Sequence, residues 1–557
     1  MGGIVGIDLG TTYSCVACVD EYARPKVLAN FDGDLTSPSV ILFAGPDDYV
    51  SGKQAKRQAL IEPHNVCSLV KRRMSDSQWR FTAFGKSWSA SGVSSLILRA
   101  LCTDAALGSG TAIDDVVITV PAYFGDEERR ATRLAGEHAG LSVIDIINEP
   151  TAAALAYGLM DCEVVTKGVG RETVLVFDLG GGTFDITIIE LSDLRISVVA
   201  TDGDRELGGA DWDERLATEL SRRFLAACPG AEDPLDDSYA AQQLLSQAEE
   251  TKRALSERKA VDTLIVHDDN RATITVTAAE LEELTASLLQ RTIDLTHSAL
   301  YHARQRGIET IDRLLLVGGS SKMPAVARAM ASEFGLRPEL VDPDLTVAKG
   351  AALYGRKRQL EREVLADLQT NGRIRQGDGM DRAAPRDLDG ALGRVAQAHG
   401  LAVSAVRQLV SIKVNNVCSR GFGVVAQDET QRRYAHFLVR RNDRLPVAVS
   451  EQFGTIVDDQ EHVRVVVFEQ AGGAESRRLE DNNILTEGII EGIPPGYPAG
   501  TDIEVTFTMG YDGLLEVTAS HAALDHALRL RVETESLVNE RTAAEREQLS
   551  NLRRRQF

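Results

Sequence analysis

The chain has 557 residues, which corresponds to about three or four domains of ordinary size, each able to bury its own core. Its 82 acidic and 61 basic residues give a formal net charge of −21, which argues against nucleic-acid and membrane-surface partners. The seven cysteines are an odd number without regular spacing, as in a reducing compartment, and no apolar run is expected to span a membrane. We therefore expect a folded cytoplasmic protein.

One short motif occurs twice in the sequence. The apolar run 4–7 ends in Asp8-Leu9-Gly10-Thr11-Thr12, and the apolar run 174–177 ends in Asp178-Leu179-Gly180-Gly181-Gly182-Thr183-Phe184-Asp185. Each copy is followed by a second β-rich stretch, so each predicts a β-hairpin closed by a Gly-Thr turn. An internal repeat of this kind indicates a duplicated fold.

Between and after the two hairpins, strands and helices alternate. Apolar strands are predicted over 116–120 and 314–317, and helices over 126–139, 211–226, 239–256 and 278–306. Alternation of this kind is typical of an α/β domain.

Beyond Ala366 the composition changes. Residues 367–386 are rich in Gly, Asp and Arg, as in a linker, and 388–410 predict one or two short helices broken at Gly400. From about Val414 the hydrophobic period becomes two, with strands predicted over 463–468, 503–509, 514–519 and 528–532. We expect an α/β unit over 1–366, a polar linker with short helices over 367–413, an antiparallel β-sandwich over 414–535 and a charged helix over 536–557.

The two Gly-Thr turns also carry chemistry. Such a turn presents backbone N–H groups and hydroxyls that fit phosphate oxygens, and a carboxylate at the strand end can hold hydrated Mg²⁺. A single Gly-rich turn can equally do no more than close a hairpin, but a second copy with Asp at the same place favours a pair of turns that clamps one triphosphate. The sequence contains no G-x-x-x-x-G-K-[ST] and no strand-linked G-x-G-x-x-G, which excludes a P-loop and gives no support to a dinucleotide site.

Five sequence strings together resemble the seventy-kilodalton heat-shock chaperone family, the DnaK-like branch of the actin and hexokinase superfamily. They are Asp8 to Ser14, Val120-Pro121-Ala122-Tyr123-Phe124, Ile147 to Ala154, Asp178 to Asp185 and Val317-Gly318-Gly319-Ser320. The match is good over roughly residues 4–360 and looser over 414–535. It implies an actin-like ATPase domain of duplicated RNase H-like units, followed by a peptide-binding β-sandwich.

The resemblance implies a set of phosphate and metal residues. The phosphates would lie between Gly10, Thr11, Thr12 and Tyr13 of one turn and Gly180, Gly181 and Gly182 of the other, with Asp8 and Asp178 on the water shell of the metal. The catalytic residues would be Lys71, Glu149, Thr183 and Asp185. Without the family, Lys71-Arg72-Arg73 is more simply interpreted as a solvated basic run.

The resemblance also implies an adenosine site. Glu249, Lys252, Arg253 and Ser256 share one helix face and would contact ribose and adenine, although a polar stripe of this spacing is usually just a solvated face. Gly318, Gly319, Ser320, Lys322 and Asp344 would hold the other side. Lys322 stands where the family has arginine, and lysine cannot stack flat on adenine. The implied cofactors are ATP or ADP and Mg²⁺, with K⁺ as a further candidate.

Two departures from the family concern the second half of the chain. The 25 residues that follow Val532 can supply about one helix, so a full helical lid over the peptide groove is not expected. The acidic, leucine-rich linker of the family is replaced by a polar stretch, which leaves only Leu409-Val410-Ser411-Ile412 as an apolar strand candidate. We expect this connector to be flexible and the coupling between the domains to be weak.

Three functions remain open at this stage. The leading one is an ATP-hydrolysing chaperone that binds unfolded or extended polypeptides, together with a J-domain co-chaperone and a nucleotide exchange factor. The second is a nucleotide-dependent scaffold with weak ATPase activity and a dedicated partner. The third, a small-molecule kinase of the same superfamily, is weakened because a β-sandwich has no place in a sugar kinase.

Overall fold

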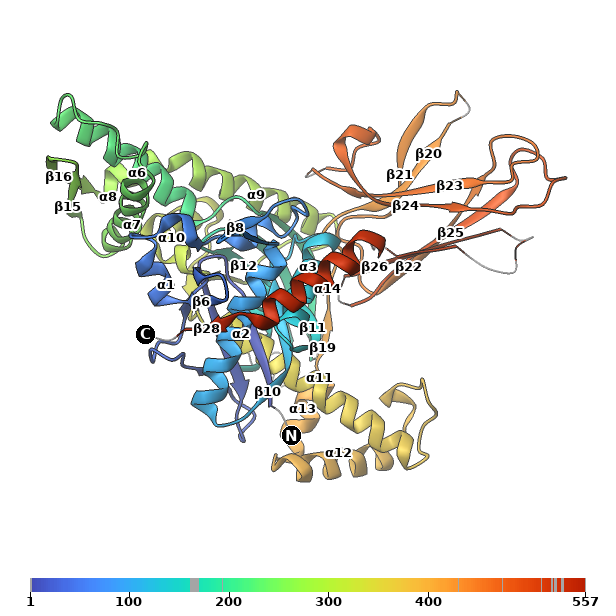
Figure 1. Ribbon diagram of the computed structural model, residues 1–557. Coiled ribbons are helices and arrows are strands. Elements are labelled where there is room, and N and C mark those ends of the chain that lie inside the picture. The colour runs from blue at the N-terminus through green and yellow to red at the C-terminus, as the bar shows by residue number, and fades with distance from the viewer. Residues whose placement is uncertain are drawn as a thin grey trace.

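The repeated hairpin lies at the centre of two six-stranded sheets in the computed structural model of the chain (Figure 1). The first sheet runs in the order β11 (Ser142–Asn148), β10 (Ile113–Val120), β1 (Gly3–Asp8), β2 (Tyr13–Val19) and β3 (Pro25–Leu28), with β4 (Ser37–Pro38) paired to β2. The second runs in the order β18 (Pro338–Leu340), β17 (Arg313–Val317), β12 (Arg171–Leu179), β13 (Phe184–Ser192), β14 (Arg195–Asp204) and β19 (Lys413–Asn415). In each sheet the first hairpin strand is antiparallel to the second and parallel to a later strand, so the strand order is duplicated as the repeat predicts.

The structure describes residues 3–160, 170–192, 194–428, 430–472, 474–511, 513–521, 524, 528–531 and 535–555. Residue 532, the last of the strand predicted over 528–532, lies outside these ranges.

Two helices fill the space between the sheets. Helices α4 (Glu149–Met160) and α11 (Thr346–Thr370) pack against each other, and α11 also packs on β1 and β2. Glycines allow the close approach, because a Cβ at Gly350 would lie 1.8 Å from the Ala152 carbonyl oxygen and a Cβ at Gly6 would lie 2.0 Å from the Ala352 nitrogen. These helices therefore fix the first sheet relative to the second.

The outer faces of the sheets are covered by further helices. Helices α2 (Ala90–Ser109) and α3 (Asp126–His138) cover the first sheet, and α9 (Ala286–Arg304) and α10 (Pro324–Phe334) cover the second. By length and composition α2 could span a membrane, which corrects the expectation that no run reaches that length. However, 78% of its most apolar window is buried, as in a core helix of a folded domain.

Each sheet carries an insertion. The first comprises β5 (Ile41–Gly45), β6 (Asp48–Ser51), β7 (Val66–Cys67), β8 (Phe81–Ala83), β9 (Lys86–Trp88), α1 (Lys53–Gln58), η1 (Pro63–Asn65) and η2 (Val70–Arg73). The second comprises α6 (Gly209–Ala227), α7 (Ser238–Leu255), β15 (Ala260–His267), β16 (Asn270–Thr277) and α8 (Ala278–Leu284), and η3 (Gly319–Lys322) follows β17. The helix predicted over 278–306 is divided into α8 and α9 at Thr285, whose backbone leaves the helical region.

The segment after Ala366 differs from a flexible connector. Helix α11 continues to Thr370, and after η4 (Met380–Arg382) the helices α12 (Pro385–His399) and α13 (Val403–Ser411) pack against it through buried apolar side chains such as Leu392 and Val406. Gly400 ends α12 in the left-handed conformation, where the sequence predicts a break. Residues 409–411, part of the expected strand candidate, instead form the last turn of α13, and the strand β19 follows and pairs in parallel with β14.

The next part of the chain is a sandwich of two four-stranded sheets, with orders β21-β20-β23-β24 and β22-β25-β26-β27. The strands are β20 (Phe422–Gln427), β21 (Arg433–Val439), β22 (Val447–Gly454), β23 (Val463–Gln470), β24 (Asn482–Ile490), β25 (Asp502–Met509), β26 (Leu515–His521) and β27 (Leu528–Arg531), with η5 (Leu479–Asp481) before β24. Alternate side chains such as Val465, Val467, Val505 and Phe507 fill one core between the sheets.

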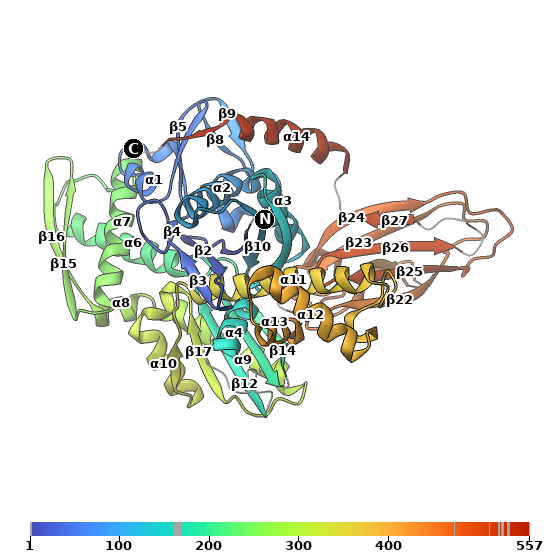
Figure 2. The ribbon, with the colours of Figure 1, turned by 90° about the horizontal axis from the view of Figure 1, so that it is seen from below.

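The last described segment returns to the first sheet and its insertion. Figures 1 and 2 show α14 (Glu535–Asn551) running from the side of the sandwich to the lobe that holds α2 and β6. Leu549 is fully buried in the core beneath α2, and Glu545 accepts hydrogen bonds from the N–H and hydroxyl of Ser89 at the start of α2. Strand β28 (Arg553–Arg554) then pairs in parallel with β6. We call this segment, Glu545–Arg555, the C-terminal strap.

We expect Leu549→Ala to release the strap. Burying a leucine contributes about 2–5 kcal/mol, which is a large share of what so short a segment can gain from docking. The amides of Arg553 and Arg555, which donate to the carbonyls of Asp47 and Tyr49, should lose protection in hydrogen–deuterium exchange. Gln548→Ala, at the exposed neighbouring position, is the control, and equal protection in both variants would contradict the assignment.

Candidate functional site

The two Gly-Thr turns face each other across the junction of the two sheets. A Cβ at Gly181 would lie 1.9 Å from the Thr12 hydroxyl oxygen, and a Cβ at Gly182 would lie 2.2 Å from the Thr11 methyl carbon. The start of α6 supports the second turn, because the N–H groups of Gly209 and Ala210 donate to the carbonyls of Gly180 and Gly181. Only glycine fits at this approach, so the two turns lie in close contact.

Carboxylates gather below the turns. Asp8 ends β1, Asp178 and Asp185 are paired opposite each other on β12 and β13, and Glu149 begins α4. Asp178, Asp185 and Glu149 are buried, and Asp8 is half-buried. Loss of water, followed by repulsion from Glu149, raises the pKa of Asp8 to about 7, and the same two causes raise the pKa values of Asp178 and Asp185 well above their usual range.

Lys71 lies among these carboxylates. Its side chain is 4% exposed, and its Nζ lies 2.5 Å from Glu149 Oε1 and 5.8 Å from the centroid of the Phe124 ring. Its charge lowers the pKa values of Asp8, Asp178 and Asp185, against the effect of burial. The interpretation of Lys71 as part of a solvated run is therefore wrong, because 71–74 form a turn in which only Arg73 is exposed.

The arrangement fits a hydrated divalent cation. Within the described ranges, no three His, Cys, Asp or Glu side chains converge closely enough to coordinate a metal directly. The buried Asp185 Oδ2 and Thr11 Oγ1 have no hydrogen-bond partner among the residues that the structure describes, and both lie beside the turns. A Mg²⁺ ion that keeps most of its water shell fits acidic side chains that lie too far apart to coordinate a metal directly. The charge of the ion would offset the repulsion between these side chains.

Arg72, which follows Lys71, holds the second turn. Its Nε donates to the Gly182 carbonyl at 2.8 Å, and its Nη atoms lie 3.3 and 2.5 Å from the two carboxylate oxygens of Asp211. Asp211 in turn accepts the N–H of Gly208 at the start of α6. A side chain from the first sheet's insertion thus holds the Gly-Thr turn of the second sheet in place.

Two of the residues expected to contact the nucleoside, Glu249 and Arg253, lie close to Tyr13 of the first turn. Tyr13 OH lies 3.5 Å from Glu249 Oε1 and 3.4 Å from Arg253 Nη1. Lys56 of α1 donates to Tyr13 OH at 3.2 Å and forms a 2.5 Å ion pair with Glu249. The ion pair therefore bridges the insertions of the two sheets. The hydroxyl of Ser256, by contrast, faces the Lys252 carbonyl of its own helix, at 3.4 Å.

The remaining expected residues lie around Gly209. Lys252 Nζ donates to the Gly209 carbonyl at 2.7 Å and pairs with Asp213, and a Cβ at Gly209 would lie 2.3 Å from Ser320 Oγ. The turn that contains Gly318 and Gly319 adjoins Asp344, since a Cβ at Gly319 would lie 3.1 Å from Asp344 Oδ1. Lys322 forms an ion pair with Asp344, and both side chains are exposed.

Several contacts at the site have no signal in the sequence. The Ala122 N–H donates to Asp185 Oδ1 at 2.8 Å, and Arg129 Nη2 donates to Asn148 Oδ1, next to Glu149, at 2.7 Å. A backbone donor is invisible in a sequence, and Lys56, Arg72 and Arg129 resemble ordinary basic residues of helices and turns. Only their partners, which are far away in sequence, distinguish them.

The raised pKa of Asp8 predicts proton release on binding of a magnesium nucleotide. With a pKa of about 7, Asp8 is partly protonated near neutral pH in the free protein, and a bound cation should lower this pKa and expel the proton. Calorimetry in buffers of different ionisation enthalpy should show a fraction of a proton more released by the native protein than by Asp8→Asn. Equal release by the two proteins would contradict the assignment.

The clamp formed by Arg72 predicts weaker nucleotide binding in Arg72→Ala. The loss of a charged hydrogen-bond network of this kind costs about 1.5–3 kcal/mol, which is about 10- to 150-fold in affinity if the turn must reorder to bind. Arg72→Lys should recover little, since lysine cannot bond Asp211 and Gly182 together. Arg73→Ala is the exposed control, and an ADP titration in which both alanine variants behave alike would refute the clamp.

A comparison with protein-family models accords with this geometry. The model described as Hsp70 protein matches residues 4–365 and 391–553. The first matched segment contains the two facing turns and the strands of both six-stranded sheets as far as β18. The second contains β19, the whole sandwich and α14, and the unmatched stretch between them includes the loop that leads into α12. Members of this family are ATPases. The match extends over most of the sequence, and the chain is a member of the Hsp70 family.

Proposed function

We propose that this protein binds ATP with Mg²⁺, hydrolyses it to ADP and phosphate, and uses its actin-like ATPase domain to control a polypeptide-binding sandwich. The observation that carries the proposal is the pair of facing Gly-Thr turns over the Lys71–Glu149 pair and the aspartates. Donors above and carboxylates below are what a triphosphate with its cation requires. K⁺ would be a second ion near the same carboxylates. Equal rates of ATP hydrolysis in K⁺ and Na⁺ buffers would argue against a K⁺ site.

Each residue of the site has a role in the proposed hydrolysis. The N–H groups and hydroxyls of Thr11, Thr12, Gly181 and Thr183 would hold the phosphates, and bound Mg²⁺, on the waters that Asp8 and Asp178 orient, would neutralise their charge. Lys71 would stabilise the negative charge that develops on the transferred phosphoryl group. Glu149, fixed by Lys71, would orient the attacking water, and Asp185 is itself fixed by the Ala122 N–H.

The sandwich supports binding of extended apolar segments. It exposes large apolar side chains in the loop between β22 and β23 and on β24, where Ile456 is 61% and Ile484 is 53% exposed. Isolated strands of an unfolded chain would bury such side chains.

J-domain co-chaperones and nucleotide exchange factors are the partners that we propose from the family. The described cysteines, all free thiols, support a cytoplasmic site of action.

The nucleotide-dependent scaffold remains a second candidate. The C-terminal strap fixes the end of α14 against α2 and β6, so α14 does not cover the sandwich as a lid would. The two candidates differ in turnover. A chaperone should hydrolyse ATP faster when unfolded protein is added, whereas a scaffold for one partner should not respond to it.

For the chemistry, we expect Lys71→Ala to lower the single-turnover rate about 10²- to 10³-fold, which is about 2.7–4 kcal/mol of transition-state stabilisation. ADP affinity should fall much less, because the turns and not Lys71 hold most of the nucleotide. Rapid-quench single-turnover assays with and without reduced, alkylated unfolded protein measure the rate and its stimulation, and a calorimetric titration with ADP measures the affinity. Arg73→Ala serves as the control, and a Lys71→Ala rate within a factor of three of the native rate would disprove the hydrolytic assignment.

A further inference from the structure

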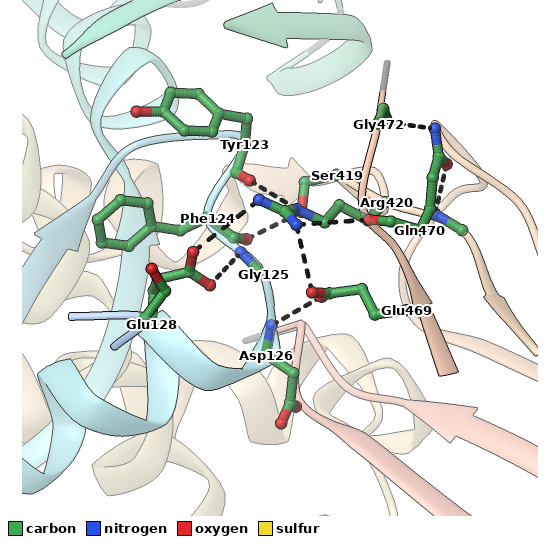
Figure 3. Close-up of polar contacts among 12 residues, drawn as sticks. Tyr123, Phe124, Gly125, Asp126, Glu128, Ser419, Arg420, Glu469, Gln470 and Gly472 are labelled. Carbon is green, nitrogen blue, oxygen red and sulfur yellow. Dashed lines mark hydrogen bonds and ion pairs between the residues drawn. The ribbon is translucent and has the colours of Figure 1, made fainter. Parts of the chain in front are cut away.

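Helix α3 points its N-terminus at the sandwich, and a sandwich residue caps it (Figure 3). The residue before the helix is Gly125, which has no side chain to accept the first N–H groups. Glu469 of β23 takes this role, since its Oε1 accepts the Asp126 N–H at 3.1 Å. A Cβ at Gly125 would lie 2.4 Å from Glu469 Oε1, so this approach depends on glycine. A carboxylate of one domain thus caps a helix of the other.

Carboxylates of both domains lie close together where α3 meets the sandwich. The side chains of Glu469 and Glu128 are 4% exposed, and that of Asp126 is fully buried. Arg420, which precedes β20, lies between them, with Nη1 3.4 Å from Glu469 Oε2 and Nη2 3.9 Å from Glu128 Oε1. The other charged groups around them are Arg130 paired with Asp126, Arg205 paired with Glu128, Arg129 on the same helix, and the exposed Glu127.

Hydrogen bonds that involve backbone groups close the same contact between α3 and the sandwich. Ser419 donates to the Phe124 carbonyl at 2.9 Å, and Arg420 Nε donates to the Tyr123 carbonyl at 3.4 Å. On the other side the Leu515 N–H donates to Asp126 Oδ1 at 3.0 Å. Separation of the domains would break all of these bonds together and return the carboxylates to water.

Burial of its carboxylates makes this contact sensitive to protons. Burial raises the pKa of Glu469 to about 7, Arg420 acts against the shift, and Glu128 adds to it. Burial also raises the pKa of Asp126, with Arg130 acting against it. Glutamate in water has a pKa of about 4.3. Glu469 therefore holds its proton more tightly in the docked junction than it would in water.

We propose that Asp126, Glu128, Arg420 and Glu469 form a proton-dependent lock between the two domains, which takes up a proton when the sandwich docks and releases it when the sandwich separates. Docking is then favoured at pH 6 and weakens as the pH rises through 7. Arg420 holds the docked form at higher pH, because it supplies the positive charge that ionised Glu469 needs. The lock acts on domain arrangement, beyond the proposed hydrolysis, and its test requires no nucleotide.

Hydrogen–deuterium exchange of the full chain measures the lock through peptides that contain the amides of Asp126 and Leu515. With labelling times scaled for the intrinsic exchange rate, their protection should fall about tenfold between pH 6 and pH 8, as expected for one group whose pKa moves from about 4.3 to about 7. Peptides from the central strand β12 provide the internal reference. A protection that is equal at the two pH values would overturn the proposal.

Three variants identify the groups. Glu469→Gln keeps the oxygen that accepts the Asp126 N–H but is neutral, so it should dock equally well at pH 6 and pH 8. Arg420→Gln should lose protection at pH 8 and regain it at pH 6, and the double variant should dock at both. The matched control is Glu487→Gln, whose exposed ion pair with Arg464 joins β23 to β24. A tenfold pH dependence that persists in Glu469→Gln would refute the lock, even if Arg420→Gln fails to fold.

Discussion

The concentration of negative charge between the two sheets is the constraint on which the rest of the site depends. Asp8, Asp178 and Asp185 come from strand ends that the duplicated fold must bring together, and Glu149 starts the helix that fills the gap between the sheets. Lys71 offsets only part of this charge, as the raised pKa values of the aspartates show. The cluster therefore carries acidic groups that its own lysine does not balance, and the charge of a cation would offset their repulsion.

The loop 121–125 contacts both the carboxylate cluster and the sandwich segment. On one side the Ala122 N–H holds Asp185 and the Phe124 ring lies against Lys71. On the other side the carbonyls of Tyr123 and Phe124 accept bonds from Arg420 and Ser419 of the sandwich segment. Five consecutive residues therefore serve both the carboxylate cluster and the domain contact. Backbone atoms of this loop supply hydrogen bonds on both sides.

Local sequence patterns predicted the elements whose interactions are local. The hairpin turns, the aspartates at the strand ends and the alternating strands of the sandwich follow from spacing alone. Residues 409–412 show the limit: Leu-Val-Ser-Ile suits a strand or a helix, and packing of Val406 and Leu409 under α11 decided for the helix. Arg72 and Glu469 were not predicted for a different reason. Each is an ordinary charged residue until a partner more than 100 positions away gives it a role.

The C-terminal strap has a consequence for the order in which the protein can fold. Leu549 and Leu552 belong to the core beneath α2, and Arg554 pairs with Asp104, some 450 positions earlier in the chain. Those positions leave the ribosome after the second sheet and the sandwich, so the core beneath α2 remains incomplete while these are being synthesised. Contacts of such high sequence separation form slowly because a long loop must close. The core beneath α2 therefore reaches its final packing only after the rest of the described chain has been made, and until then its apolar side chains stay uncovered on that side.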